Sequence, residues 1–144
     1  MTRRVRLLLA AALVLLAQAA CGHRSPEDRV RATFEGCRAA VEAGDAARAT
    51  EPLDAAFRGP EGMDRTTARL FLGGTLRGQK VGVTVLRDEI RVDGAEATQV
   101  VDLVLTGRAQ GLLPQETSRR TFLLRWRERS GQWKLLALQS PEEP

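Results

Sequence analysis

The sequence has no tyrosine and a single histidine, and these two shortages exclude several kinds of active site. Histidine is the commonest acid–base residue of enzymes, and a tyrosine hydroxyl often donates to a developing oxyanion. The one histidine, His23, stands two residues from Cys21 in a polar stretch, where we expect no fixed substrate geometry. We therefore expect no Ser–His–Asp set and, because ligands at zinc spacing are absent, no metal. No cofactor is expected either, since Gly73-Gly74 and Gly107…Gly111 lack the strand–loop–helix setting of phosphate motifs.

The sequence also lacks an apolar run long enough to span a bilayer, which takes about 20 residues. The longest run, Leu7–Ala17, follows a basic stretch and precedes the small residues Ala19 and Ala20. This three-part pattern is typical of a bacterial secretory signal. We expect residues 1–20 to be a signal peptide and the protein to be exported to the cell envelope.

Cysteine is scarce as well, and the first of the two cysteines directly follows the predicted signal peptide. The residues Ala-Ala-Cys-Gly at 19–22 resemble the lipobox of bacterial lipoproteins, in which the cysteine is acylated and begins the mature chain. Gln18 departs from that pattern, and Ala17-Gln18-Ala19 is an acceptable plain cleavage site. A disulfide between Cys21 and Cys37 is chemically open after export. We expect Cys21 to be the lipid attachment site, with the membrane as partner and a soluble periplasmic or secreted form as the alternative.

The charge balance gives no support for a nucleic-acid partner. The chain has 22 Lys+Arg and 18 Asp+Glu, a net charge of +4. Three arginines of the leader leave with it, so the mature chain carries 19 basic and 18 acidic residues. Nucleic-acid binding needs a concentrated basic footprint, which this balance does not supply.

The first predicted helix begins directly after the leader. Ser25 is a good N-cap and Pro26 suits the first turn. The apolar positions recur at helical spacing and end before Gly44; they are Val30, Phe34, Cys37 and Val41. Cys37 therefore falls on the apolar face as a small core residue, which leaves Cys21 without a natural disulfide partner.

Two further helices are predicted before residue 80. Asp45 caps the second, which Pro52 should break and which should end near Phe57. Asp64 caps the third, and Gly78 ends it. The predicted buried stripe of this third helix consists of Ala68, Phe71, Leu72, Thr75 and Leu76.

From Lys80 the apolar residues alternate with a period of two, which predicts strands. The apolar parity changes before Ile90, so a β-bulge is predicted near Arg87–Glu89. Asp93-Gly94 and Ser130-Gly131 are tight-turn signals, and residues 107–116 are predicted to form a long loop or a bulged hairpin. These turns and the loop divide the segment into four predicted antiparallel strands, of which the last is residues 132–139.

The predicted class is α+β, with three N-terminal helices packed on a strongly curved four-stranded antiparallel sheet. We expect residues 21–25 to form a tether, residues 26–139 one domain and residues 140–144 a flexible tail. A domain of this size buries roughly two-thirds of its unfolded surface, so it can fold without disulfides.

The order of these elements, with the stretches GDAARATEPLDAAFRGPEGMDR and RSGQWKLL, resembles the nuclear transport factor 2-like superfamily over residues 26–139. It is similar in particular to small secreted bacterial members. The resemblance implies a cystatin-like cone, in which a bent sheet wraps a long helix around a cavity, and a candidate homodimer through the open sheet face. Relatives include isomerases, dehydratases, cyclases and non-enzymatic binding domains, so the fold does not fix the function.

The candidate cavity-lining residues are those whose parity or helical position points inward: Phe34, Phe71, Gln99, Leu103, Phe122, Trp126 and Trp133. For most of the apolar residues in this set, a place in the core is the favoured alternative. Gln99 shares the parity of its apolar neighbours, so we expect it to enter the cavity as a hydrogen-bonding group. Asp102 has two interpretations: a cavity base with a raised pKa, or a carboxylate on the opposite face that pairs with an arginine across strands. The alternation favours the second interpretation.

An arginine stripe on one side of the third strand is the clearest charge feature, formed by Arg119, Arg125, Arg127 and Arg129. It is a candidate face for an anionic partner. The alternative is a solvated sheet face that Asp88, Glu89 and Glu96 balance.

These observations predict an exported, lipid-anchored, non-enzymatic domain that binds an apolar small molecule or an envelope protein. The alternative is an enzyme of the isomerase, dehydratase or cyclase type that uses a carboxylate in the cavity. A cavity filled by side chains would weaken the small-molecule prediction and leave an interaction domain.

Overall fold

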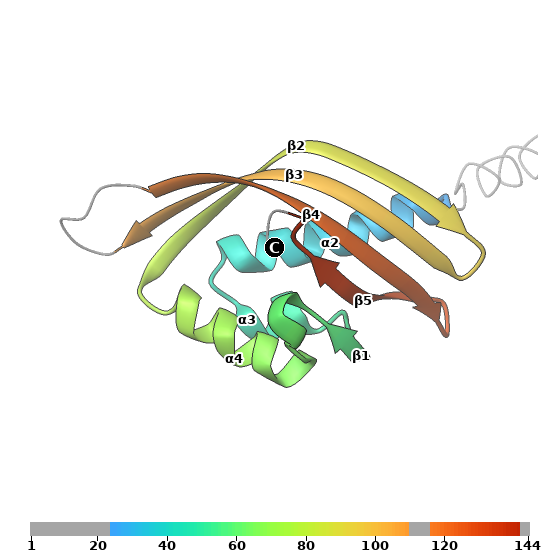
Figure 1. Ribbon diagram of the computed structural model, residues 1–144, viewed down its shortest axis with the longest axis horizontal. Coiled ribbons are helices and arrows are strands. Elements are labelled where there is room, and N and C mark those ends of the chain that lie inside the picture. Colours follow the sequence, from blue (N-terminus) through green and yellow to red (C-terminus); the bar gives the residue numbers. More distant parts are fainter. Residues whose placement is uncertain (1–23, 110–115, 142–144) are drawn as a thin grey trace, which may run out of the picture.

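The structure is a computed structural model, and it describes residues 24–109 and 116–141. Within these ranges the elements follow in the order α2 (Pro26–Glu42), α3 (Ala46–Thr50), β1 (Leu53–Arg58), a 3-10 turn (Pro60–Gly62), α4 (Arg65–Leu76), β2 (Gln79–Asp93), β3 (Glu96–Ala109), β4 (Glu116–Arg129) and β5 (Gln132–Gln139). Figure 1 shows β2, β3 and β4 arching over α2, with α3 and α4 on the same side of the sheet. No helix in the described ranges has the length and apolar character needed to cross a bilayer.

The long helix α2 begins where the sequence predicts. The Ser25 side chain accepts a hydrogen bond from the backbone N–H of Asp28 at 3.1 Å, which satisfies one of the free donors at the helix start. Val30 is fully buried and Phe34 nearly so, which turns the apolar stripe toward the sheet. The chain leaves the helix through Gly44, whose positive φ of 74° suits glycine.

The sheet has five strands in the order β1-β5-β4-β3-β2, and it is mixed. β2 to β5 pair antiparallel, whereas β1 lies parallel to β5 at the edge. The prediction of a four-stranded antiparallel sheet is therefore wrong by one strand. The order of the four antiparallel strands is as predicted.

The missing strand lies where the sequence predicts the rest of a helix. α3 is capped by Asp45 as predicted and stops at Thr50, and residues 53–58 are extended. Pro52 ends the helix because it lacks the N–H that the next turn would need. Leu53 and Phe57 are both buried, and their spacing of four fits a helix as readily as an irregular edge strand. The apolar pattern alone could not distinguish the two.

A β-bulge in β2 sets which side chains face α2. Val85 pairs with Leu103 and Arg87 pairs with Asp102, so Leu86 has no partner and the parity changes there. The predicted bulge is confirmed, one residue earlier than expected. A second register shift, between Arg125 and Trp126 of β4, leaves an extra residue in β5. Bulges bend strands, and the two allow the sheet to curve around the helix.

α4 is oriented differently from the prediction. Phe71 is 62% exposed and Leu70 is 73% exposed, so Phe71 is not a cavity-lining residue. The side of α4 that carries Gly73 lies against α3, close to the side chain of Ala46. The inward row of α4 is Ala68, Leu72 and Leu76, so Phe71 and Thr75 fall outside the buried stripe.

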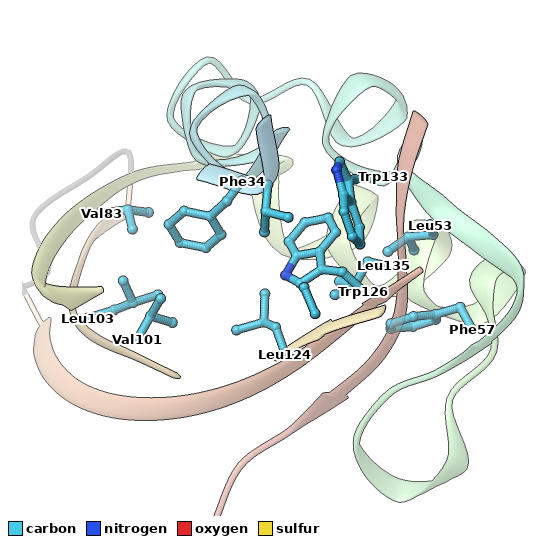
Figure 2. Packing of buried hydrophobic residues seen from close by; sticks show 12 residues of the cluster. Phe34, Leu53, Phe57, Val83, Val101, Leu103, Leu124, Trp126, Trp133 and Leu135 are labelled. Carbon is cyan, nitrogen blue, oxygen red and sulfur yellow. The ribbon is translucent and has the colours of Figure 1, made fainter. Parts of the chain in front are cut away.

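The core fills the space between α2 and the concave face of the sheet. Figure 2 shows Phe34 pointing from the helix toward the side chains of Val101 and Leu103, with Trp126 beside it. Leu53, Phe57 and Leu135 extend the same cluster toward β1. One continuous core therefore joins the helix, the long strands and the edge strand.

Asp54 ties the edge strand to the rest of the sheet. Its side chain is 3% exposed, and it accepts from the backbone N–H of Ala56 and from Nε of Arg129, both at 2.8 Å. The hydrogen bond from Ala56 and the charge of Arg129 lower the pKa of Asp54, and they outweigh burial, which acts in the opposite direction.

Replacing Asp54 tests this link. Asp54→Asn should lower the free energy of unfolding at pH 7 by about 1–3 kcal/mol, because Arg129 loses its charged acceptor. A carboxyl whose pKa is lowered in the folded state stabilises the protein above its unfolded pKa, near 3.9, and loses that effect as the pH falls through the folded pKa. Urea unfolding at several pH values should therefore show the variant and the wild type converging below about pH 4. A difference that stays constant over this range would contradict the assignment.

Candidate functional site

A chain of hydrogen bonds crosses the interior from the sheet to α2. Trp126 Nε1 donates to Gln99 Oε1 at 2.9 Å, and Gln99 Nε2 donates to Asp88 Oδ1 at 2.9 Å. Asp88 Oδ2 then accepts from Nε of Arg31 at 3.1 Å, and Arg31 also pairs with Asp28 at 3.1 Å. Gln99 is fully buried, as its parity predicts. We call Trp126, Gln99, Asp88 and Arg31 the interior polar chain.

Strand register places the interior polar chain. Gln99 lies opposite Ile90 on β2, and Trp126 lies opposite Ala97 on β3, so the hydrogen bonds run between diagonal neighbours. The bulge at Leu86 is required, because it moves Asp88 to the inner face of β2.

The interior polar chain offers little to a substrate. A general base needs a lone pair directed at the proton that it removes. Both oxygens of Asp88 already accept from protein donors, and both ends of the Gln99 amide are engaged. The arrangement is suited to fixing the pairing of the strands and the position of α2 on the sheet.

Asp88 was not predicted in this role. The sequence places it among the acidic residues that balance the outer arginines, whereas its side chain faces α2 and is only 16% exposed. The change of apolar parity is the signal that could have found it. Once the bulge is placed before residue 88, the alternation puts Asp88 on the same face as Ile90 and Val92.

The predicted cavity residues other than Phe71 are largely packed against one another. Phe34, Gln99, Leu103, Trp126 and Trp133 are each no more than 8% exposed, and Phe122 is partly buried against the same cluster. The clefts identified on the surface of the described residues are lined by other side chains than Phe34, Gln99 and Leu103.

Asp102 lies on the outer face of the sheet, as the alternation predicts. It accepts from Thr121 Oγ1 at 2.8 Å and lies 3.5 Å from Arg119 and 4.0 Å from Arg87. This position faces away from α2, so Asp102 does not carry out base chemistry in the interior.

The predicted arginine stripe is largely paired with carboxylates. Besides the contact of Arg119 with Asp102, Arg127 lies 4.0 Å from Glu96 and Arg129 binds Asp54. Arg125 is exposed. Of the acidic residues expected to balance the stripe, Glu96 does so, Glu89 pairs with Arg87 at 3.1 Å, and Asp88 faces inward.

The described cysteine is unreactive in its surroundings. Cys37 is a free, partly buried thiol, and burial together with the charge of Glu51 raises its pKa to about 11. It therefore stays protonated near neutral pH. The residues described in the structure contain no group of three His, Cys, Asp or Glu side chains placed to hold a metal ion. Cys21 and His23, like most of the predicted loop before β4, lie outside the described residues.

The arrangement of a long helix in a curved mixed sheet defines an α+β cone. No family model and no curated protein matches the chain. Among solved structures, a nuclear transport factor 2-like superfamily protein from Salmonella enterica superposes with a TM-score of 0.67 at 14% identity, over 79% of this chain and 88% of that one. A nuclear transport factor 2-like protein from Cytophaga hutchinsonii gives 0.65 at 16% identity, over 81% and 98%.

A proposed scytalone dehydratase from Novosphingobium aromaticivorans superposes with a TM-score of 0.70 at 12% identity, over 78% of this chain and 82% of that one. The chain therefore has the nuclear transport factor 2-like fold, as the sequence predicts. Identities this low establish the fold alone, and this fold includes both binding domains and dehydratase-like enzymes.

The interior polar chain can be tested by removing its central amide. Gln99→Leu should lower the free energy of unfolding by about 1–3 kcal/mol, because the buried indole N–H of Trp126 loses its acceptor. Adding Trp126→Phe removes that donor, so Gln99→Leu should be less destabilising in the Trp126→Phe background. Urea unfolding of the four proteins measures this coupling.

Gln139→Leu supplies the matched control, because Gln139 is exposed at the end of β5. That substitution should change the stability by less than about 0.5 kcal/mol. Equal effects of Gln99→Leu and Gln139→Leu would show that the interior amide has no structural role.

Proposed function

We propose that the protein is an exported, lipid-anchored interaction domain without catalytic activity. The observation that carries the proposal is the interior polar chain, whose hydrogen-bonding groups are engaged by one another. An enzyme of this fold needs a base and an oxyanion donor that face the substrate. Here the interior amide and carboxylate bind protein groups instead.

The packed interior favours a protein partner over an apolar small molecule. Phe34 and Leu103 fill the concave side of the sheet together with Val101, which is fully buried. A ligand inside the cone would have to displace these side chains, and a well-packed core resists such displacement. An envelope protein can instead bind the outer surface.

Export and anchoring rest on the sequence. The apolar run Leu7–Ala17 and the following Ala-Ala-Cys-Gly support acylation of Cys21. Acyl chains contribute about 0.8 kcal/mol per buried CH₂, and more than one chain is needed for stable attachment. Because α2 begins at Pro26, only a short tether would separate the membrane from the domain.

An enzyme of the isomerase, dehydratase or cyclase type is the alternative. The position of Asp88 favours an enzyme, because this carboxylate faces the interior and its side chain is still 16% exposed. The enzyme would have to release Asp88 from Arg31 and Gln99 before it could act as a base.

The intact mass of the protein purified from its native envelope tests the anchor. The mature chain should begin at Cys21 and carry the added mass of two or three acyl chains. Cys21→Ser should abolish that mass, and Cys37→Ser, the matched control, should leave it unchanged. A mature chain that begins at Ala20 with an unmodified cysteine would overturn the lipid anchor.

A small apolar probe tests whether the interior is filled. Leu103→Ala removes a side chain that is 7% exposed and should open a cavity able to hold benzene. Benzene should then shift core methyl NMR resonances in the variant and leave those of the wild type in place. Saturable binding to the wild type would show a hollow interior and would restore the small-molecule interpretation.

A further inference from the structure

The two tryptophans of the chain are buried to a similar degree but differ in their hydrogen bonds. Trp126 donates to Gln99, whereas Trp133 Nε1 is inaccessible to solvent and has no acceptor among the described residues. Trp133 is only 3% exposed. An unsatisfied buried donor costs about 1–3 kcal/mol, and folded proteins rarely leave one without a reason.

The indole of Trp133 lines a cleft between α2 and the start of β5. The cleft has a volume of about 340 Å³, and its walls include Ala32 and Thr33 of α2 and Pro52 before β1. Figure 2 shows the indole nitrogen of Trp133 at the end of the ring that points toward the helices, away from the centre of the core. The unpaired N–H therefore lies on the helix side of the ring (Figure 2), beneath the surface of this cleft, where a water molecule does not reach it.

Basic side chains surround the same cleft. Arg24, Arg29 and Lys134 line it, and Glu51 is the one acidic residue among its lining residues. Arg29 is held in place by the carbonyl of Gly131 at 2.6 Å and also lies 3.5 Å from Glu128. Lys134 Nζ lies 3.5 Å from the backbone oxygen of Glu51, and the Glu51 carboxylate lowers the net positive charge of the cleft.

We propose that this cleft binds a phosphate ester. The indole N–H would donate to a phosphate oxygen once the side chains that cover it move aside. Arg24, Arg29 and Lys134 would supply positive charge at the rim, which Glu51 and Glu128 offset in part. A phosphate monoester carries a charge near −2 and a phosphodiester a charge of −1, and both have strong acceptor oxygens, which matches one neutral donor and a net positive rim. The volume is at the lower end of small-molecule sites, so the ligand is small or contributes only its head group.

Two sources could supply this chemistry. Arg24 is three residues from Cys21, and an extended chain covers at most about 3.5 Å per residue. The head group of an anionic phospholipid is therefore within reach if Cys21 is acylated, and this source alone rests on the proposed lipid anchor. A soluble phosphate ester is the second source, and it requires no anchor.

NMR of the indole N–H groups tests the site directly. The chain has two tryptophans, so ¹⁵N-labelled mature protein carrying Cys21→Ser gives two indole resonances. Glycerol 3-phosphate should shift the Trp133 resonance saturably and leave that of Trp126 in place, because Trp126 is bound to Gln99. Acetate should act only at much higher concentration. A stationary Trp133 resonance, or equal binding of acetate, overturns the proposal.

Two substitutions separate binding from folding. Trp133→Phe keeps most of the ring and removes the donor, so it should weaken glycerol 3-phosphate binding about tenfold in calorimetry. Trp126→Phe is the matched control and should leave the affinity unchanged. Lys134→Gln, at a partly exposed position, should weaken binding and reduce its salt dependence while the fold is retained. Wild-type affinity in both Trp133→Phe and Lys134→Gln would contradict the site.

Bicelles distinguish the two sources. If the ligand is a lipid head group, bicelles that contain phosphatidylglycerol should shift the Trp133 resonance at far lower phosphate concentration than glycerol 3-phosphate does, and pure phosphatidylcholine bicelles should not. If the ligand is soluble, glycerol 3-phosphate should be the stronger probe. A Trp133 resonance that responds to neither excludes the site. Because the protein used here carries no acyl chain, that failure would leave the anchoring test by mass unaffected.

Discussion

The structure depends on one geometric requirement, which is that three strands of 14 to 15 residues bend around a single helix. The bulge at Leu86 meets this requirement in β2 and changes which side chains face inward. Before the bulge, Val83 and Val85 face α2; after it, Asp88, Ile90 and Val92 do. The curvature of the sheet and the position of the only acidic group in the interior polar chain therefore have the same origin.

The interior polar chain then fixes the pairing register of β2, β3 and β4, which the bulge makes possible. Val101 and Leu103 would tolerate several apolar neighbours, because apolar contacts are not directional. The amide of Gln99 is different, since it must meet the indole of Trp126 on one side and the carboxylate of Asp88 on the other. A slip of one residue in β3 would turn this amide to the outer face and leave its partners unsatisfied.

The features that sequence predicts here are those with a local cause. These features are the helix caps at Ser25, Asp45 and Asp64, the turn at Asp93-Gly94 and the bulge. Each depends on residues a few positions apart. The caps lie at the predicted residues, and the bulge lies one residue before the predicted range. The failures depend on long-range packing. β1 is a strand because β5 offers it an edge, and Phe71 is exposed because α4 packs against α3 on the side that carries Gly73. The role of Asp88 joins β2 to α2 across 57 residues.

The contrast between the two tryptophans links the fold to its surface. A cone whose interior groups are engaged by one another has little capacity left inside for a ligand. Among the described residues, a buried donor without an acceptor is found instead at Trp133, near the start of β5 and just after the turn at Ser130-Gly131. That position is also where Arg24, Arg29 and Lys134 gather. A neutral donor beside cationic side chains would add direction to the attraction that charge alone provides, and this direction matters here because Glu51 and Glu128 offset part of the positive charge.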